Sequence, residues 1–273
     1  MNGILAQIVA ITAYGNNYLT YGHVPAGFYP DNATFRFCNK VDFLEFHQPW
    51  LSKKLKETVV APEPGEWFRY LKKDGCQRLR LCFKSTGDQA IAKEHKLAGM
   101  AGGGGTWYIE AVYKNYSNLW SNRWQVHDPN AADQKIWSVN YGRTSWRQKT
   151  QNLQIAQDGM KEQLGNTLLE LAEFAFKQNL ESWGKQFESA LGILASEHPE
   201  EQYCHKDLIP LNNYSLTAKQ ILFAAGQAWE FGGMGSWNDL RVSNKEDNEL
   251  YDKLSAQLYY NIIDAVICAV NSY

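Results

Sequence analysis

The chain has 273 residues, and its 27 lysine and arginine residues nearly balance its 29 aspartate and glutamate residues. A hydrophobic fraction of 44% is ordinary for a globular protein, and a chain of this length can bury a large core without disulfides or metals. The near-neutral charge and the lack of a basic run argue against a nucleic-acid partner. No stretch reaches the roughly 18 apolar residues of a membrane span, which argues against a membrane partner.

The first half of the chain has the period-two alternation that is typical of β-strands. Apolar side chains occupy every second position in residues 78–83 and again in residues 136–141. These segments are predicted as half-buried strands of an antiparallel sheet. Weaker strand candidates are residues 4–12, 34–38, 67–71 and 107–113. Residues 51–57 are predicted as a short helix.

From about residue 152 the apolar residues recur every three or four positions, which predicts helices. Two helices cover the apolar positions between residues 160 and 175 and between 183 and 194. A third begins near Thr217, which with Gln220 forms a capping box, and extends to Phe231. The last helix begins after Ser243, which is followed by Glu246 at the same spacing.

Strands first and helices second predict an α+β fold, in which an antiparallel β-rich N-terminal half packs with a C-terminal group of about four helices. The expected division is a β-rich domain at residues 1–148 and a helical domain at residues 149–273. No proline-, glycine- or serine-rich linker separates them, so one shared core is the alternative.

Motifs for metal, cofactor and phosphate binding are missing from the sequence, and no metal or cofactor is predicted. The run of four glycines at residues 102–105 precedes a predicted strand, whereas a phosphate-binding loop follows a strand and opens a helix. A catalytic site would have to assemble in space at the boundary between sheet and helices. Its candidate residues are Glu110, Arg123, His127, Asp128, Arg143 and Asp239. For Glu110, alternation favours an outward-facing polar side chain over a catalytic carboxyl group.

Ten tryptophans suggest an aromatic binding surface. The segment at residues 120–124 places Arg123 between Trp120 and Trp124. Aromatic rings with a neighbouring arginine bind the side chains of partner proteins, sugars or bases. We therefore predict these three residues as binding residues, and burial in the core is the alternative.

The most specific string of the chain is Gly-Gly-Met-Gly-Ser-Trp-Asn-Asp at residues 232–239. Glycine suits the left-handed turn that ends a helix and allows close backbone approach, which predicts structural roles for Gly232, Gly233 and Gly235. The remaining side chains can cap the turn and fill the space between helices. A binding role is the alternative for Trp237, Asn238 and Asp239.

This string resembles a GGMGS-(Trp/Phe)-Asn-Asp signature of uncharacterised small bacterial helical proteins, where it lies between the penultimate and the last helix. With its flanking helices the resemblance covers about one-fifth of the chain and none of residues 1–148. It implies a bacterial origin and a likeness to the immunity-type proteins found near bacterial toxin and conflict loci.

These observations favour a non-enzymatic bacterial protein that binds another protein, for instance as an immunity or defence-associated binder. The alternatives are a hydrolase or transferase with a site at the sheet–helix boundary, and a module that binds a small ligand or carbohydrate. A cytoplasmic location is expected, because no lysine or arginine precedes Arg36 as a secretory signal would require, and because the cysteines are odd in number without a CxxC pair. They are Cys38, Cys76, Cys82, Cys204 and Cys268.

Overall fold

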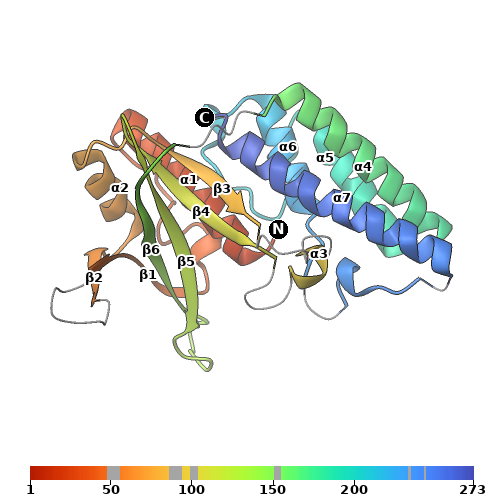
Figure 1. Cartoon of the computed structure of the whole chain (residues 1–273), viewed down its shortest axis with the longest axis horizontal. Helices are drawn as coiled ribbons and strands as arrows, with labels where there is room; N and C mark the ends of the chain where they lie inside the picture. Colours follow the sequence, from red (N-terminus) through yellow and green to blue (C-terminus); the bar gives the residue numbers. More distant parts are fainter. Residues whose placement is uncertain (48–55, 86–93, 99–103, 151–154, 233–234, 243) are drawn as a thin grey trace.

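The computed structural model describes residues 1–47, 56–85, 94–98, 104–150, 155–232, 235–242 and 244–273 (Figure 1). Six strands form one sheet in the order β2-β1-β6-β5-β4-β3. The strands are β1 (Cys38–His47), β2 (Lys56–Ala61), β3 (Arg78–Lys84), β4 (Thr106–Val112), β5 (Ser117–Val126) and β6 (Trp137–Gln148). The α-helices are α1 (Gly3–Tyr21), α2 (Pro64–Lys73), α3 (Glu94–Leu97), α4 (Gln157–Lys177), α5 (Glu181–Ala195), α6 (Leu216–Gln227) and α7 (Lys245–Val270).

The fold class is α+β, as predicted, but the sheet is mixed. All strand pairs are antiparallel except β1 with β6, which run parallel. These two neighbours are separated by most of the N-terminal half, and that long connection allows the chain to return in the same direction. Figure 1 shows α4, α5, α6 and α7 as a bundle beside the β3 edge of the sheet.

One face of the sheet packs against α1 and α2. The Tyr141 hydroxyl on β6 donates to the Gln7 amide oxygen on α1 at 3.1 Å. The Phe43 ring on β1 stacks on Trp67 of α2 with centroids 4.3 Å apart. Large aromatic rings therefore fill the layer between the sheet and these two helices.

Two of the predicted strands are helices. Residues 4–12 lie in α1, and residues 67–71 lie in α2. Helix α1 is buried at every position from Leu5 to Asn17, so it has no polar face that would show the helical period. Helix α2 begins at Pro64, where a missing backbone N–H costs nothing, and it buries side chains at helical spacing.

The other predicted strands agree better with the structure. Residues 78–83, 107–112 and 137–141 lie in β3, β4 and β6. Of residues 34–38, the first two belong to the 3₁₀ helix η1 (Ala33–Phe35) and only Cys38 lies in a strand. Of the short helix predicted at residues 51–57, residues 51–55 lie outside the described residues, and the last two belong to β2.

The helices predicted in the second half correspond to α4, α5, α6 and α7, with corrected ends. Helix α6 is capped by Ser215, which accepts from the Ala218 N–H at 3.1 Å, and it ends at Gln227. Helix α7 is capped by Asn244, which accepts from the Asp247 N–H at 2.7 Å. The predicted cap Ser243 lies outside the described residues.

A continuous cluster of buried residues includes side chains from both halves of the chain, among them Leu81 on β3 and Val270 on α7. Two asparagines bond the free edge of β3, and the second of them joins the two halves of the chain. Asn16 on α1 bonds the backbone of Leu79, and Asn271 at the end of α7 bonds the backbone of Leu81. The expected boundary at residue 148 coincides with the end of β6, and the core continues across it.

Candidate functional site

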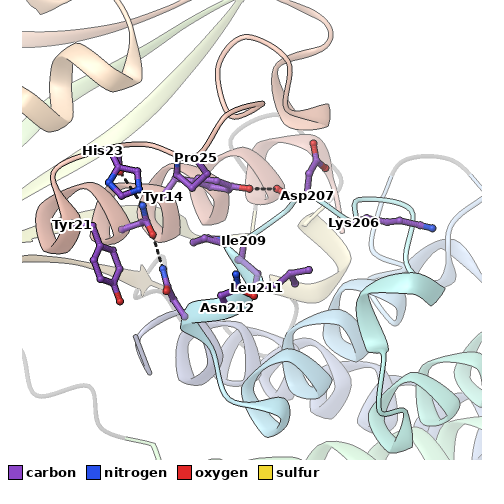
Figure 2. Close-up of a pocket in the computed structure, with 12 residues that line it drawn as sticks. Tyr14, Tyr21, His23, Pro25, Lys206, Asp207, Ile209, Leu211 and Asn212 are labelled. Atoms are coloured by element: carbon purple, nitrogen blue, oxygen red, sulfur yellow. Dashed lines mark hydrogen bonds between the residues drawn. The ribbon is translucent and has the colours of Figure 1, made fainter.

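A cleft of about 570 Å³ lies between the second half of α1 and the segment that precedes α6 (Figure 2). One wall is formed by α1 and the turn after it, and the other by residues 206–213. The lining residues are Tyr14, Asn17, Tyr21, His23, Pro25, Lys206, Asp207, Ile209, Pro210, Leu211, Asn212 and Asn213.

The first wall follows from the helical geometry of α1. Tyr14, Asn17 and Tyr21 are spaced by three and four residues, which places them on one stripe of the helix. The helix ends at Gly22, whose φ of 81° is the left-handed conformation that glycine adopts without strain. The chain then turns back and brings His23 to the mouth of the cleft (Figure 2).

The second wall is fixed through Asp207. Its backbone carbonyl accepts from the Tyr14 hydroxyl at 3.1 Å and from the Asn32 side chain at 2.5 Å. Its carboxylate accepts from the Ala33 N–H at 2.7 Å. Asp207 therefore anchors residues 206–213 to the N-terminal half of the chain.

A chain of amide groups connects the two walls. The Asn213 side chain donates to the Asn17 side-chain oxygen at 2.6 Å and to the Tyr273 hydroxyl at 3.2 Å. The Asn17 side chain in turn donates to the His23 carbonyl at 3.0 Å. Because half-buried hydrogen bonds hold both walls, the cleft does not need a ligand to form.

Burial raises the pKa of Tyr14 to about 12, and the nearby charge of Asp207 acts in the same direction. Tyr14 is therefore protonated at neutral pH and serves as a hydrogen-bond donor within the wall, not as a base. Its ring stacks on Phe28 with centroids 4.3 Å apart, which fixes its orientation.

The chemistry of the cleft suits binding. Pro25, Pro210 and Leu211 supply apolar surface, and the exposed amide of Asn212 supplies a donor and an acceptor at the rim. The Tyr21 side chain is 58% exposed at the mouth. Within the described residues, no three histidine, cysteine, aspartate or glutamate side chains are grouped to hold a metal ion.

The six residues considered for catalysis lie in separate places. Glu110 is fully buried, which corrects the prediction that it faces outward. Its carboxylate accepts from the Arg80 guanidinium and from the Ser117 hydroxyl, each at 2.6 Å. Arg143 is also buried and forms an ion pair with Glu45 at 2.9 Å. Both charged groups are thus neutralised inside the fold.

The other four of these residues are at or near the surface. Arg123 is half-exposed and pairs with Glu57 across the sheet at 3.1 Å. His127 and Asp128 are exposed where β5 ends, and Asp239 is exposed in the turn before α7. None of the described cavities is lined by two of the six residues.

The structure does not bring together the three residues predicted as an aromatic binding surface at residues 120–124. Trp120 is fully buried and packs edge-on against Trp67 with centroids 5.2 Å apart. Trp124 is half-buried and packs against Trp137. Only Arg123 faces solvent, because neighbouring residues on a strand point to opposite faces of the sheet and cannot stack together.

The glycine-rich string forms a turn that is closed by its own side chains. The Gly232 N–H donates to the Asn238 side chain at 3.0 Å, and the Gly235 N–H donates to the Asp239 carboxylate at 3.1 Å. Gly235 has a φ of 86°, whereas Gly232 has no positive φ. Gly233 lies outside the described residues.

Trp237, from the same string, is fully buried, and its indole N–H donates to the Ser255 hydroxyl at 2.8 Å. Its ring fills the space between helices, against Phe187 of α5 and Tyr251 of α7. It is therefore a core residue and not a surface anchor. Asn238 and Asp239 line a separate cavity of about 460 Å³.

The residues of the cleft between α1 and residues 206–213 are all absent from the predicted site. Their signal in the sequence was the spacing of Tyr14, Asn17 and Tyr21, which is visible only once residues 4–21 are assigned to a helix. The opposite wall comes from an irregular segment almost 200 positions later in the chain, and no local pattern indicates that it meets α1.

Comparison with protein-family models, with curated proteins and with solved structures found no match to this chain. Among the described residues, no helix has the length and apolar composition that crossing a membrane requires.

Proposed function

We propose that this chain is a non-catalytic binding protein that holds a segment of another protein in the cleft between α1 and residues 206–213. The observation that carries the proposal is a preformed cleft with apolar walls, an amide rim and an exposed aromatic ring at its mouth. Protein–protein contacts concentrate their binding energy where an aromatic or aliphatic side chain enters such a pocket.

The hydrogen bonds within the walls support this proposal. Asp207 and Asn213 hold the two walls together through Tyr14 and Asn17, so binding orders few additional groups. A site fixed in advance loses less of its interaction energy to conformational entropy. Asn212, whose amide is exposed at the rim, can hydrogen-bond the backbone of an extended segment.

Tyr21 is the expected anchor on this chain. Its ring is largely exposed, and the centroid lies 6.3 Å from that of His23. Tyrosine supplies a large contact area with few rotatable bonds, and it is enriched among the residues that dominate binding. We expect Tyr21→Ala to weaken binding of the partner by at least tenfold, about 1.4 kcal/mol.

Site-directed photo-crosslinking tests the proposal. A photo-reactive phenylalanine derivative replaces Asn212 at the rim, and in a matched control it replaces Leu169, which is 50% exposed on α4. In cells that naturally make the protein, we expect a protein adduct from position 212 that is missing from position 169. The adduct should lose most of its yield in a Tyr21→Ala background.

The captured protein must then also bind this chain without crosslinking. Purified separately, it should form a saturable 1:1 complex with the wild-type chain and a weaker one with the Tyr21→Ala variant. Failure to form a protein adduct from position 212, or an affinity unchanged by Tyr21→Ala, would contradict the proposal. A small molecule retained in native mass spectra and lost with the same substitution would instead assign the cleft to a metabolite.

A further inference from the structure

A second feature suited to binding lies at the end of β6, at residues that do not line the cleft. Trp146 is 57% exposed, although most of the large apolar side chains of the chain are buried. Its ring is covered on one side by the guanidinium of Arg143, whose Cζ lies 3.5 Å from the ring centroid. This contact is close enough for a cation–π interaction, which fixes the plane of the indole.

Arg143 is itself held by a buried network. Its guanidinium pairs with the Glu45 carboxylate on β1 at 2.9 Å, and the Tyr70 hydroxyl on α2 donates to the same carboxylate at 2.5 Å. Its Cζ also lies 6.0 Å from the centroid of Trp120. The arginine that contacts two indoles is thus Arg143, and not Arg123 as the sequence suggested.

The consequence of this network is a pre-oriented aromatic surface. Glu45 and Tyr70 position Arg143, and Arg143 positions the exposed ring of Trp146. Binding partners that contact such a ring do not have to order it first.

The next residue, Arg147, is fixed in an unusual conformation. Its φ is 46°, a left-handed backbone conformation that residues other than glycine rarely adopt. Its backbone N–H donates to the Asn118 side chain at 2.9 Å, and its guanidinium lies 5.1 Å from the centroid of Tyr116. Strained residues of this kind persist where the surrounding structure holds them, and they occur preferentially at binding and catalytic sites.

The exposed charges near Trp146 are mostly positive, and the exposed carboxylate of Asp74, which acts on Tyr70 and Tyr113, is the negative one among them. Arg147 is exposed at the end of β6, Lys149 is exposed directly after the strand, and Lys114 is exposed in the turn that contains Tyr116. The charge of Arg143 is already balanced by Glu45. In a chain with a net charge of −2, this local excess of positive charge is complementary to carboxylates.

We propose that Trp146 and Arg147 form a docking surface for an acidic segment of a partner protein. An apolar side chain of that segment packs on the Trp146 ring, and its carboxylates bind Arg147 and Lys149. This surface shares no residue with the cleft between α1 and residues 206–213, so the proposal stands or falls separately from the proposed function.

Titration with synthetic peptides tests the docking surface directly. The probe is a short peptide of glutamate residues around one central phenylalanine, and the comparison peptide has lysine in place of every glutamate. Tryptophan fluorescence and calorimetry at low salt should show saturable binding of the acidic peptide alone. Affinity should fall steeply as the salt concentration rises, because exposed charges supply part of the attraction.

Three variants locate the binding. Trp146→Ala and Arg147→Gly should each weaken the acidic peptide by about tenfold or more. Arg147→Gly is the cleaner change, since glycine adopts a φ of 46° without strain and the fold is retained. Val126→Ala, at a residue that is also 57% exposed on β5, should leave the affinity unchanged.

Several results would overturn the proposal. They are the absence of saturable binding of the acidic peptide, equal binding of the lysine peptide, and an affinity that Arg147→Gly does not change. Tighter binding of a single-stranded oligonucleotide that displaces the peptide would assign the surface to nucleic acid instead, since tryptophan and arginine also stack on bases.

Discussion

The side-chain amide of Asn271, at the end of α7, pairs with the backbone of Leu81 in both directions. It accepts from the Leu81 N–H at 2.7 Å and donates to the Leu81 carbonyl at 2.9 Å. Asn16 on α1 does the same for Leu79, at 2.7 and 2.9 Å. Strand β3 is an edge of the sheet, and edge strands expose backbone groups that invite pairing with other chains. The two asparagines therefore provide hydrogen-bond partners for the backbone groups of Leu79 and Leu81 at this edge, and they connect the sheet to α1 and α7.

The first prediction concerns these two asparagines. Asn16→Ala removes two hydrogen bonds and leaves a buried N–H and carbonyl of Leu79 without partners, and we expect a loss of about 2–4 kcal/mol in the free energy of unfolding. Asn271→Ala should cost less, about 1–2 kcal/mol, because Asn271 is partly exposed. Urea denaturation followed by circular dichroism measures both losses.

The matched control is Asn130→Ala, at an exposed position in the β5–β6 connection. It should change the free energy of unfolding by no more than about 0.5 kcal/mol. If Asn16→Ala proves as mild as the control, water replaces the asparagine at the edge of β3, and the proposed link between sheet and helices is wrong.

A second prediction concerns Gly15 of α1, where the steric cost of adding a Cβ opposes the gain in helix propensity. A Cβ at this position would lie 2.4 Å from the Leu79 side chain and 2.8 Å from the Phe68 ring. Alanine gains about 1 kcal/mol over glycine in a helix, but overpacking a tight core costs about 1–3 kcal/mol. We therefore expect Gly15→Ala to lower the melting temperature.

Gly192 on α5 offers the opposite case, because nothing lies within 4 Å of the position of its Cβ. Gly192→Ala should raise the free energy of unfolding by about 0.5–1 kcal/mol. An increase in stability for both variants would show that α1 can shift away from the sheet.

A third prediction separates a structural role of Trp237 from a binding role. Trp237→Phe removes the hydrogen bond to Ser255 and leaves space between α5 and α7. We expect a cost of about 2–4 kcal/mol in the free energy of unfolding. The same substitution at the exposed Trp146 should change that quantity by only about 0.5 kcal/mol. A stable Trp237→Phe variant would contradict the structural role and restore the binding interpretation of this residue.

A helix or strand could be predicted from the sequence where its burial leaves a regular pattern of apolar and polar residues. Strand β3 alternates apolar and polar residues, and it was predicted. The middle of its polar face is nevertheless buried, because Arg80 is paired with Glu110 on the neighbouring strand. Alternation reports polarity and not exposure, and for that reason the outward position predicted for Glu110 was wrong.

The elements that escaped prediction have no clean period. Strand β1 contains an irregularity in register between Phe43 and Leu44, so its apolar residues do not alternate. Helix α1 is buried all round and therefore resembles a buried strand over short windows. Because α1 forms one wall of the cleft, this misassignment is one reason why the cleft was not predicted, and the distance in sequence to the opposite wall at residues 206–213 is the other.

The last prediction concerns pH and His95 on α3. The side chain is 2% exposed, and neither ring nitrogen has a hydrogen-bond partner in the part of the chain that the structure describes. Burial lowers the pKa of His95 from its ordinary value of 6.5, and the charge of Lys96 lowers it further, whereas Asp252 on α7 opposes the change. In the folded protein His95 is therefore neutral at neutral pH.

The sign of the effect follows from this lowered pKa. Below pH 6.5 the unfolded chain binds a proton at His95 that the folded chain does not, so acidification favours unfolding. The loss in the free energy of unfolding should reach at most about 1.4 kcal/mol per pH unit and continue down to the pKa of the folded state.

We expect His95→Phe to remove this contribution to the pH dependence of the free energy of unfolding between pH 6.5 and 5, as measured by urea denaturation at each pH. His198→Phe, at an exposed histidine, is the control for the loss of an imidazole at the surface. Equal slopes for wild type and His95→Phe would mean that His95 is protonated in the folded state as readily as in the unfolded one.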